Sequence, residues 1–161
     1  SALIMIPVAA PELLVGVALL MFFLMINFTL GMTSIILAHT AFCLSFVTIS
    51  VKTRMYGMDE SLVDAARDLG ASPTKAFFWV LVPTILPGII AGWLMAFTLS
   101  LDDFVITFFT SGVGSTTLPL AIYSMLKIGV TPEVNAISTI IILVTLVLTT
   151  LATKLSKTNA K

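Results

Sequence analysis

The chain has 161 residues, with eight basic and eight acidic side chains that cancel to a net charge of zero. It is 58% hydrophobic, and its mean hydropathy is +1.14. Charged residues make up 10% of the sequence, whereas soluble domains contain about 25%. This deficit excludes a disordered chain and a charged nucleic-acid-binding protein, and it indicates a membrane protein.

Four apolar stretches are predicted to cross the membrane, because a helix needs about 20 apolar residues to do so. The uncharged run 13–51 is too long for one span, and the turn formers Asn27 and Gly31 divide it. Pro7 and Pro11 predict a kink in the first helix. The chain starts at once on an apolar helix, without an initiator Met or a signal-peptide pattern, so we expect further spans upstream. The predicted spans are 2–26, 33–51, 84–110 and 132–154.

The stretch 104–126 could form a fifth span, but the Gly- and Ser-rich segment 111–117 interrupts it. With four spans, the basic residues of the loop 52–83 share a side with the basic C-terminal tail. Lys and Arg concentrate on the cytoplasmic side, so four spans and a cytoplasmic C-terminus are favoured. The segment 111–131 then forms an outer loop, with a short helix at 118–128. Thr131 is the predicted cap of the last span, with Pro132 and Glu133 in its first turn.

The loop 52–83 is predicted to hold two short helices. Ser61 and Asp64 resemble a capping box at the start of the first helix. Gly70 suits the left-handed position after a helix end. Ser72–Pro73 predicts the start of the second helix, with serine as its cap.

The first of these helices is amphipathic, and its surface is mainly acidic. Helices that lie on lipid usually carry a basic face, so membrane lipid is the less favoured partner. The acidic surface favours docking into a groove on a protein. The acids are Asp59, Glu60, Asp64 and Asp68, against Arg67, and the apolar face comprises Leu62, Val63, Ala65, Ala66 and Leu69.

The loop resembles the EAA loop of ABC importer permeases, whose pattern is E-A-A, three residues, G, nine residues, I-x-L-P. Here Asp64-Ala65-Ala66 is followed at the same spacing by Gly70 and by Val80-Leu81-Val82-Pro83. Asp replaces Glu, and Val replaces both Ile and Leu. The resemblance implies that Asp64, Ala65, Ala66, Gly70 and Pro83 belong to a coupling loop, 59–83, that docks onto an ATP-binding subunit.

Three further segments, 98–103, 118–124 and 127–136, resemble the spermidine/putrescine branch of this family, and in particular its second permease subunit. The resemblance implies an all-α membrane protein: the C-terminal part of a six-span type I ABC permease with a cytoplasmic coupling helix, in the bacterial inner membrane. It implies as partners an ATP-binding subunit dimer, a second permease subunit and a periplasmic or extracellular solute-binding protein. The chain would form half of a polyamine pathway without being an enzyme. The alternatives are another small solute (thiamine, an amino acid or a metal ion) and a non-transport scaffold.

The third predicted span carries small residues at a strict four-residue interval. Such a stripe lets helix backbones approach closely, so we expect it to pack against another helix. The residues are Gly88, Gly92, Ala96 and Ser100.

Asp102 and Asp103 follow this stripe at the C-terminal end of the predicted helix. The helix dipole disfavours negative charge there, so we expect neither acid to serve helix stability. Carboxylates within membrane segments mark cation paths, and aromatic rings such as Tyr123 attract ammonium groups. Both acids, with Glu12 and Tyr123, are therefore the candidate pathway for a small cationic substrate. The alternatives are boundary acids or partners of Lys127, and for Glu12 the first turn of a restarted helix.

His39 is the only histidine and Cys43 the only cysteine. A single cysteine excludes an internal disulfide, and no H-E-x-x-H motif occurs. We expect Cys43 to be a small core residue, and His39 to be a buried, hydrogen-bonded helix contact in preference to a proton relay. The sequence predicts no catalytic group, metal site, cofactor or nucleic-acid partner.

Overall fold

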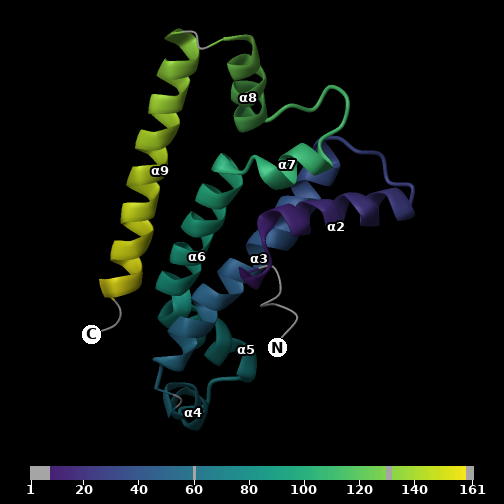
Figure 1. Ribbon diagram of the computed structural model, residues 1–161. Helices are drawn as coiled ribbons and strands as arrows, with labels where there is room; N and C mark the ends of the chain where they lie inside the picture. Colours follow the sequence, from purple (N-terminus) through teal and green to yellow (C-terminus); the bar gives the residue numbers. More distant parts are fainter. Residues whose placement is uncertain (1–7, 60, 130–131, 159–161) are drawn as a thin grey trace.

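A computed structural model describes residues 8–59, 61–129 and 132–158, and every element in these ranges is a helix (Figure 1). This confirms the predicted all-α membrane fold. The start of the first predicted span and the cap Thr131 lie outside the described residues. The helices are α2 (Glu12–Met25), α3 (Met32–Tyr56), α4 (Ser61–Asp68), α5 (Pro73–Ala76), the π-helical turn η1 (Phe77–Leu81), α6 (Val82–Asp102), α7 (Val105–Thr110), α8 (Leu118–Ile128) and α9 (Pro132–Thr158).

Within the described residues, three helices are long and apolar enough to cross a membrane: 32–56, 73–102 and 134–151. The described part of the first predicted span is α2, which has 14 residues. It begins at Glu12, directly after Pro11, so the predicted restart of the helix is confirmed. In Figure 1, α2 lies across the direction of α3, α6 and α9.

The helix that contains α6 begins 11 residues before the predicted start at 84, because α5, η1 and α6 are continuous from Pro73 to Asp102. Pro83 does not end this helix. A proline donates no hydrogen bond to the carbonyl four residues earlier. The π-helical turn η1 ends two residues before Pro83. The hydroxyl of Thr84 donates to the carbonyl of Val80 over 2.6 Å, which adds a hydrogen bond at this irregular point.

The predicted single helix at 84–110 is wrong, since it breaks after Asp102. Asp103 has an extended backbone, with φ −64° and ψ 123°, and a second helix, α7, starts at Val105. The side chain of Asp103 accepts hydrogen bonds from the backbone N–H groups of Ile106 and Thr107. These are unpaired donors of the first turn of α7, and a short acidic side chain is well suited to satisfy them.

The stripe of small residues on α6 lies against α3. A Cβ added at Gly92 would meet Ser50 and Val47, each at 3.2 Å, and one added at Gly88 would come within 2.7 Å of Arg54. Hydrogen bonds to carbonyls cross the same interface, from Ser50 Oγ to Gly88 and from Cys43 Sγ to Ala96. The absence of side chains at Gly88 and Gly92 therefore lets the backbones of α3 and α6 pack closely.

The core lies where α2, α3 and α7 meet. Gly16 of α2 faces α7, where an added Cβ would come within 2.8 Å of the Phe109 ring. Ser34 is fully buried and donates to the carbonyl of Thr110 over 2.7 Å, which ties α3 to the end of α7. Cys43 is buried as predicted. The core cluster comprises Phe23, Ala38, Phe42, Cys43 and Ile106.

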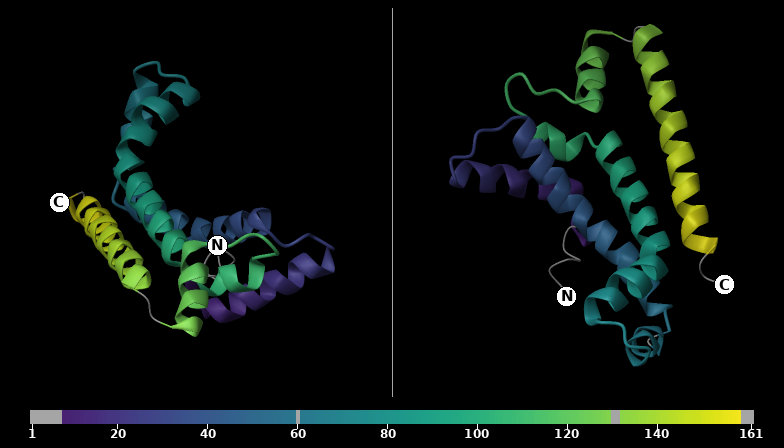
Figure 2. Two further views of the ribbon diagram at one scale, coloured as in Figure 1. Left: turned by 90° about the horizontal axis from the view of Figure 1, so that it is seen from above. Right: turned by 180° about the vertical axis from the view of Figure 1, so that it is seen from behind.

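The two ends of the molecule are formed by different helices. The helices α4 and α5 and the C-terminal end of α9 lie at one end, and α8 lies at the other, as the views in Figures 1 and 2 agree. The predicted short helix at 118–128 coincides with α8. The described loop basic residues and Lys154 thus share an end of the structure.

Candidate functional site

The loop between α3 and α6 is a helix–glycine–helix unit. Gly70 has φ +86°, in the left-handed region that favours glycine. The N–H of Ala71 donates to the carbonyl of Ala66, and that of Gly70 to the carbonyl of Arg67, which is the pattern of a Schellman helix end. Ser72 then accepts from the N–H of Lys75 over 3.3 Å and caps α5. Both turn predictions are therefore confirmed.

The start of α4 differs from the predicted capping box. Ser61 is the first residue of α4 itself, and its N–H donates to the carboxylate of Asp59 over 2.9 Å. Hydrogen bonds from the side chain and backbone of Ser61 lower the pKa of Asp59. The acid that serves this helix end is thus Asp59, two residues before the predicted serine.

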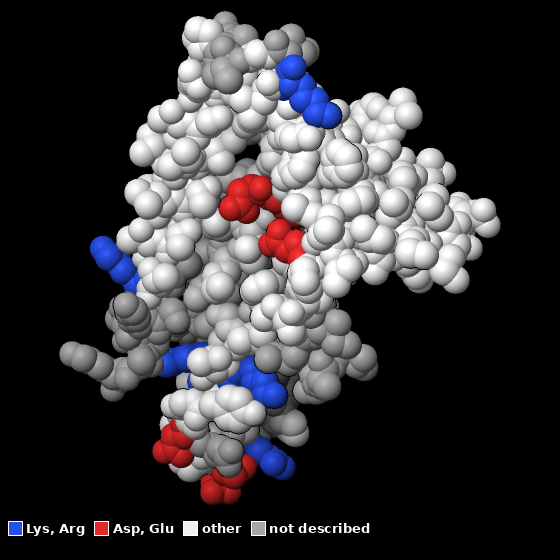
Figure 3. All heavy atoms as spheres, viewed as in Figure 1, with Lys and Arg blue, Asp and Glu red and all other residues white. Residues whose placement is uncertain are grey.

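The surface of this loop is open. Leu69 is 89% exposed, Leu62 is 42% exposed, and Asp64 and Ala65 are also exposed. Figure 3 shows acidic and basic side chains side by side at this end of the molecule. An apolar surface with a charged border is what a helix that binds in a protein groove presents. Pro83 lies apart from it, exposed in the first turn of α6.

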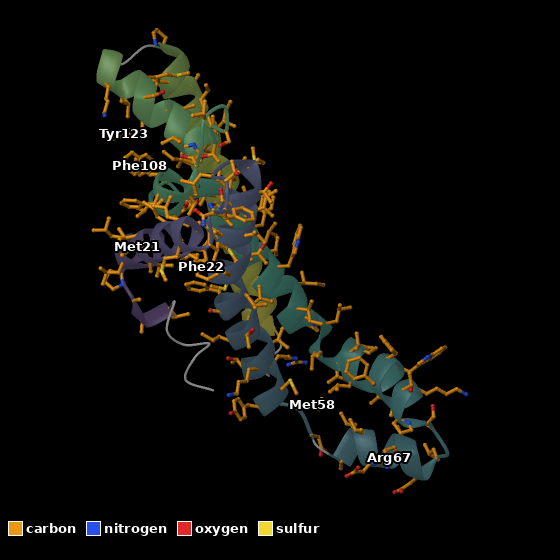
Figure 4. The ribbon with its side chains drawn as sticks, turned by 90° about the vertical axis from the view of Figure 1, so that its right-hand side faces the viewer. Met21, Phe22, Met58, Arg67, Phe108 and Tyr123 are labelled. Carbon is orange, nitrogen blue, oxygen red and sulfur yellow. The ribbon has the colours of Figure 1, made fainter. Side chains whose placement is uncertain are left out.

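At the other end of α6, Asp102 lines an open groove of about 290 Å³ between α6, α8 and α9. The groove is mainly apolar and holds two aromatic rings, Phe104 and Tyr123, whose centroids are 4.7 Å apart. Phe108 continues the aromatic row, 5.6 Å from Phe104, and Figure 4 shows Phe108 and Tyr123 on the same side of the molecule. One carboxylate beside aromatic faces is suited to an organic ammonium ion.

Lys127 does not neutralise these acids: among the described residues, no ion pair joins it to Asp102 or Asp103. Its Nζ lies over the ring of Tyr123, 4.9 Å from the centroid. Figure 3 shows acidic atoms at mid-height on one face, surrounded by uncharged ones. Outside the loop, the acids whose side chains the structure describes are Glu12, Asp102 and Asp103. Glu12 is exposed in the first turn of α2, where a negative charge is favoured.

Asp103 occupies a different environment from its neighbour. Its Oδ2 lies 3.2 Å from Nε2 of His39, and the two side chains are 6% and 11% exposed. Nε2 also lies 2.9 Å from the hydroxyl of Thr107, and Nδ1 lies 2.8 Å from the hydroxyl of Ser100. His39 therefore joins α3 to both α6 and α7, so its predicted role as a hydrogen-bonded helix contact is confirmed.

Sequence reasoning missed this polar cluster because it placed Asp103 inside an unbroken helix. The expectation that neither acid serves helix stability is wrong for Asp103, which caps α7. The sequence did offer a signal, because Asp is one of the short polar residues that satisfy the unpaired N–H groups at a helix start. The apolar run around it concealed the break.

The long apolar helices define a helical membrane protein, and sequence comparison gives its family. Residues 1–157 match the model of the binding-protein-dependent transport system inner membrane component family, and the chain belongs to that family. The resemblance to ABC importer permeases is thereby confirmed.

Several relatives are named as permease proteins of polyamine transport systems. The chain is 42% identical over 159 residues to the spermidine/putrescine transport system permease protein PotC of Haemophilus influenzae, covering 99% of this chain and 62% of that protein. It is 44% identical over 142 residues to the putrescine transport system permease protein PotI of Escherichia coli, covering 84% and 50%. The PotC protein of Escherichia coli is 39% identical over 148 residues, covering 92% and 56%. The chain thus spans between 50% and 62% of the length of these relatives.

Proposed function

We propose that this chain is part of the transmembrane permease subunit of an ATP-driven importer for a polyamine such as spermidine or putrescine. It forms half of the translocation pathway, and ATP hydrolysis is assigned to a partner ATP-binding subunit. The observation that carries the proposal is one continuous helix with two distinct ends. Its first turns, residues 73–83, belong to the open coupling loop, and the groove of Asp102 and Tyr123 lies at its far end.

The groove supports a polyamine because such a solute has ammonium groups along an apolar stem. A carboxylate pairs with one ammonium group, aromatic rings attract it further, and the apolar lining from α8 and α9 accommodates the stem. The names of the relatives point to the same solutes. Glu12 is proposed as a further part of the acidic path, and Asp103 is proposed to add its charge to the path without contacting the solute.

The loop supports an ATP-binding partner, because its exposed surface of apolar and acidic residues matches helix-in-groove docking. We place this end of the molecule, and with it the C-terminus, in the cytoplasm, since most of the described basic residues lie there and Lys127 is the exception. A second permease subunit completes the pathway, and a solute-binding protein delivers the solute on the outer side.

Uptake of radiolabelled spermidine by the reconstituted complete importer tests the proposal. Asp102→Asn is expected to weaken the apparent affinity by about tenfold, the value of one charge-assisted hydrogen bond. Gly70→Asp is expected to abolish uptake together with solute-stimulated ATP hydrolysis, because it strains the turn and adds charge to the docking surface. Gly57→Ala is the matched control, since an added Cβ there makes only an ordinary contact at 3.8 Å. Wild-type uptake in all variants would contradict both the solute and the coupling assignments.

A change of solute would leave the permease role intact. Competition by unlabelled solutes decides between a polyamine and another small solute. Spermidine and putrescine are expected to block uptake of the labelled spermidine, and thiamine, amino acids and metal ions are not. A scaffold without transport would show no ATP-dependent uptake of any of these solutes.

A further inference from the structure

We propose that His39 is a positioning residue that holds Asp103 at the junction of α6 and α7, so that Asp102 is left as the carboxylate that receives the solute cation. The inference rests on the proposed function and goes beyond it. Two adjacent acids, which the sequence presents as equivalent, are given separate roles.

The first step concerns the hydrogen-bonding capacity of Asp103. An ionised carboxylate offers about four acceptor positions. Asp103 receives the backbone N–H of Ile106 at 3.2 Å, the N–H of Thr107 at 2.8 Å and the hydroxyl of Thr107 at 2.9 Å. Nε2 of His39 also lies 3.2 Å from Oδ2. Three of these four groups therefore contact Oδ2 and one contacts Oδ1, and with 6% of its side chain exposed Asp103 is poorly accessible to a solute.

The second step concerns His39, which contacts three elements. It projects from α3, and its ring lies between Ser100 of α6 and Thr107 of α7. With an N–H on Nε2, the ring donates toward Asp103 and Thr107, and Nδ1 bonds to the hydroxyl of Ser100. Loss of the imidazole would leave Asp103 and both hydroxyls with fewer partners in a low-dielectric setting, which is costly.

The third step links this junction to Asp102. Asp102 is the last residue of α6 and is exposed beside Phe104, which lies in the two-residue break. The direction of Asp102 and Phe104 into the groove therefore depends on how the break is held. His39 acts on the solute through this geometry and does not line the groove of Asp102.

A double-mutant cycle on the complete importer tests the pairing of His39 with Asp103. His39→Leu and Asp103→Asn are each expected to lower uptake at low spermidine concentration about tenfold by raising the apparent KM, because a loosened break misdirects Asp102. The double variant is expected to lose about tenfold, not about 100-fold, because the two changes remove the same contact. Multiplicative losses would overturn the proposal.

Asp102 is expected to affect the same constant directly. Asp102→Asn raises the apparent KM about tenfold and changes the maximal rate little, since it removes solute binding. His39→Gln, whose amide can still donate to Asp103, is expected to retain uptake within about threefold of wild type. If His39→Gln is as impaired as His39→Leu while both fold, as shown by equal yield and thermal midpoint, a positioning hydrogen bond is excluded. Thr48→Val is the control on the same helix, because its hydroxyl bonds only to the carbonyl of Leu44.

Cysteine labelling separates this inference from the proposed function. In a Cys43→Ala background, Asp102→Cys is expected to react with a cationic methanethiosulfonate reagent at least about tenfold faster than Asp103→Cys. The reason is that a thiol at position 102 faces the open groove, whereas a thiol at position 103 is largely shielded from the reagent. Equal rates would overturn the division of roles. If the rates differ as expected but no variant alters spermidine uptake, the polyamine function fails while the junction geometry stands.

Discussion

Adjacent residues in this chain have different environments according to the backbone between them. Asp102 ends a helix and is exposed, whereas Asp103 lies beyond that end and is almost fully buried among donors. The residue types alone do not distinguish them, because both are aspartates in an apolar run. What distinguishes them is which backbone N–H groups lack a partner, and this depends on where the helix breaks.

Asp59 gives a prediction on pH at the residue scale. Hydrogen bonds from Ser61 lower its pKa in the folded state. A lowered pKa stabilises the fold above the ordinary carboxyl pKa, and this contribution is lost as the pH falls through the lowered value. We expect hydrogen exchange at the N–H of Ser61 to accelerate below about pH 4, beyond the intrinsic change, and to track the intrinsic rate between about pH 5 and 8. An Asp59→Ala protein that shows the same acid step would contradict this origin.

Gly112 gives a second prediction. A Cβ at this position would collide with the carbonyl of Leu30, and a backbone atom cannot move aside as a flexible side chain can. Gly112→Ala is therefore expected to destabilise the protein by about 1–3 kcal/mol, the usual cost of overpacking. The measurement is the free energy of unfolding of the detergent-solubilised chain in denaturant. Gly31→Ala is the control, because no atom lies within 4 Å of its added Cβ, and an equal loss there would refute the steric explanation.

At the scale of elements, the pair α3 and α6 shows how much of the helix packing could be predicted from the sequence. The four-residue spacing of small side chains on α6 predicts a helix contact, and in the structure these residues pack against α3. The partner helix could not be predicted, because small residues define a surface without specifying which helix covers it. The helix ends in the loop could be predicted, since glycine and serine–proline have strong local conformational preferences.

A bulky residue on the stripe is expected to separate these two helices. Gly92→Leu would drive its side chain into Ser50 and Val47, both of which lie 3.2 Å from the position of its Cβ. We expect a large loss of folded protein, measured by size-exclusion chromatography of a fluorescent fusion. Ala41→Leu, on an exposed position of α3, adds a similar apolar volume and is expected to leave the yield unchanged. Comparable yields for the two variants would rule out close packing at Gly92.

At the scale of the molecule, the helices arrange the charged loop and the end of α9 together, with α8 at the opposite end. Much of the remaining surface is apolar: Ile142 and Leu146 of α9 are 65% and 63% exposed, and Met21 and Phe22 of α2, labelled in Figure 4, are 60% and 54% exposed. Such faces suit lipid or neighbouring subunits. Hydropathy predicted this membrane character but not the crosswise course of α2.

The orientation can be measured with two engineered thiols in a Cys43→Ala background. Thr74→Cys lies on α5 at the loop end, and Val113→Cys is fully exposed between α7 and α8. In intact spheroplasts, a membrane-impermeant maleimide is expected to label position 113 and to spare position 74 until the cells are lysed. Labelling of position 74 from outside would reverse the proposed topology. Wild-type protein, with only the buried Cys43, reports the background.

The continuous helix from Pro73 to Asp102 has a mechanical consequence. At about 1.5 Å per residue, its 30 residues make a rod about 45 Å long. Tilting such a rod at the α5 end moves Asp102 with it, whereas the break at Asp103 separates α7 from this rod. The turn η1 and the interior Pro87 are the points of lower stiffness. A pull on the loop would therefore shift one wall of the groove relative to the other and change its width.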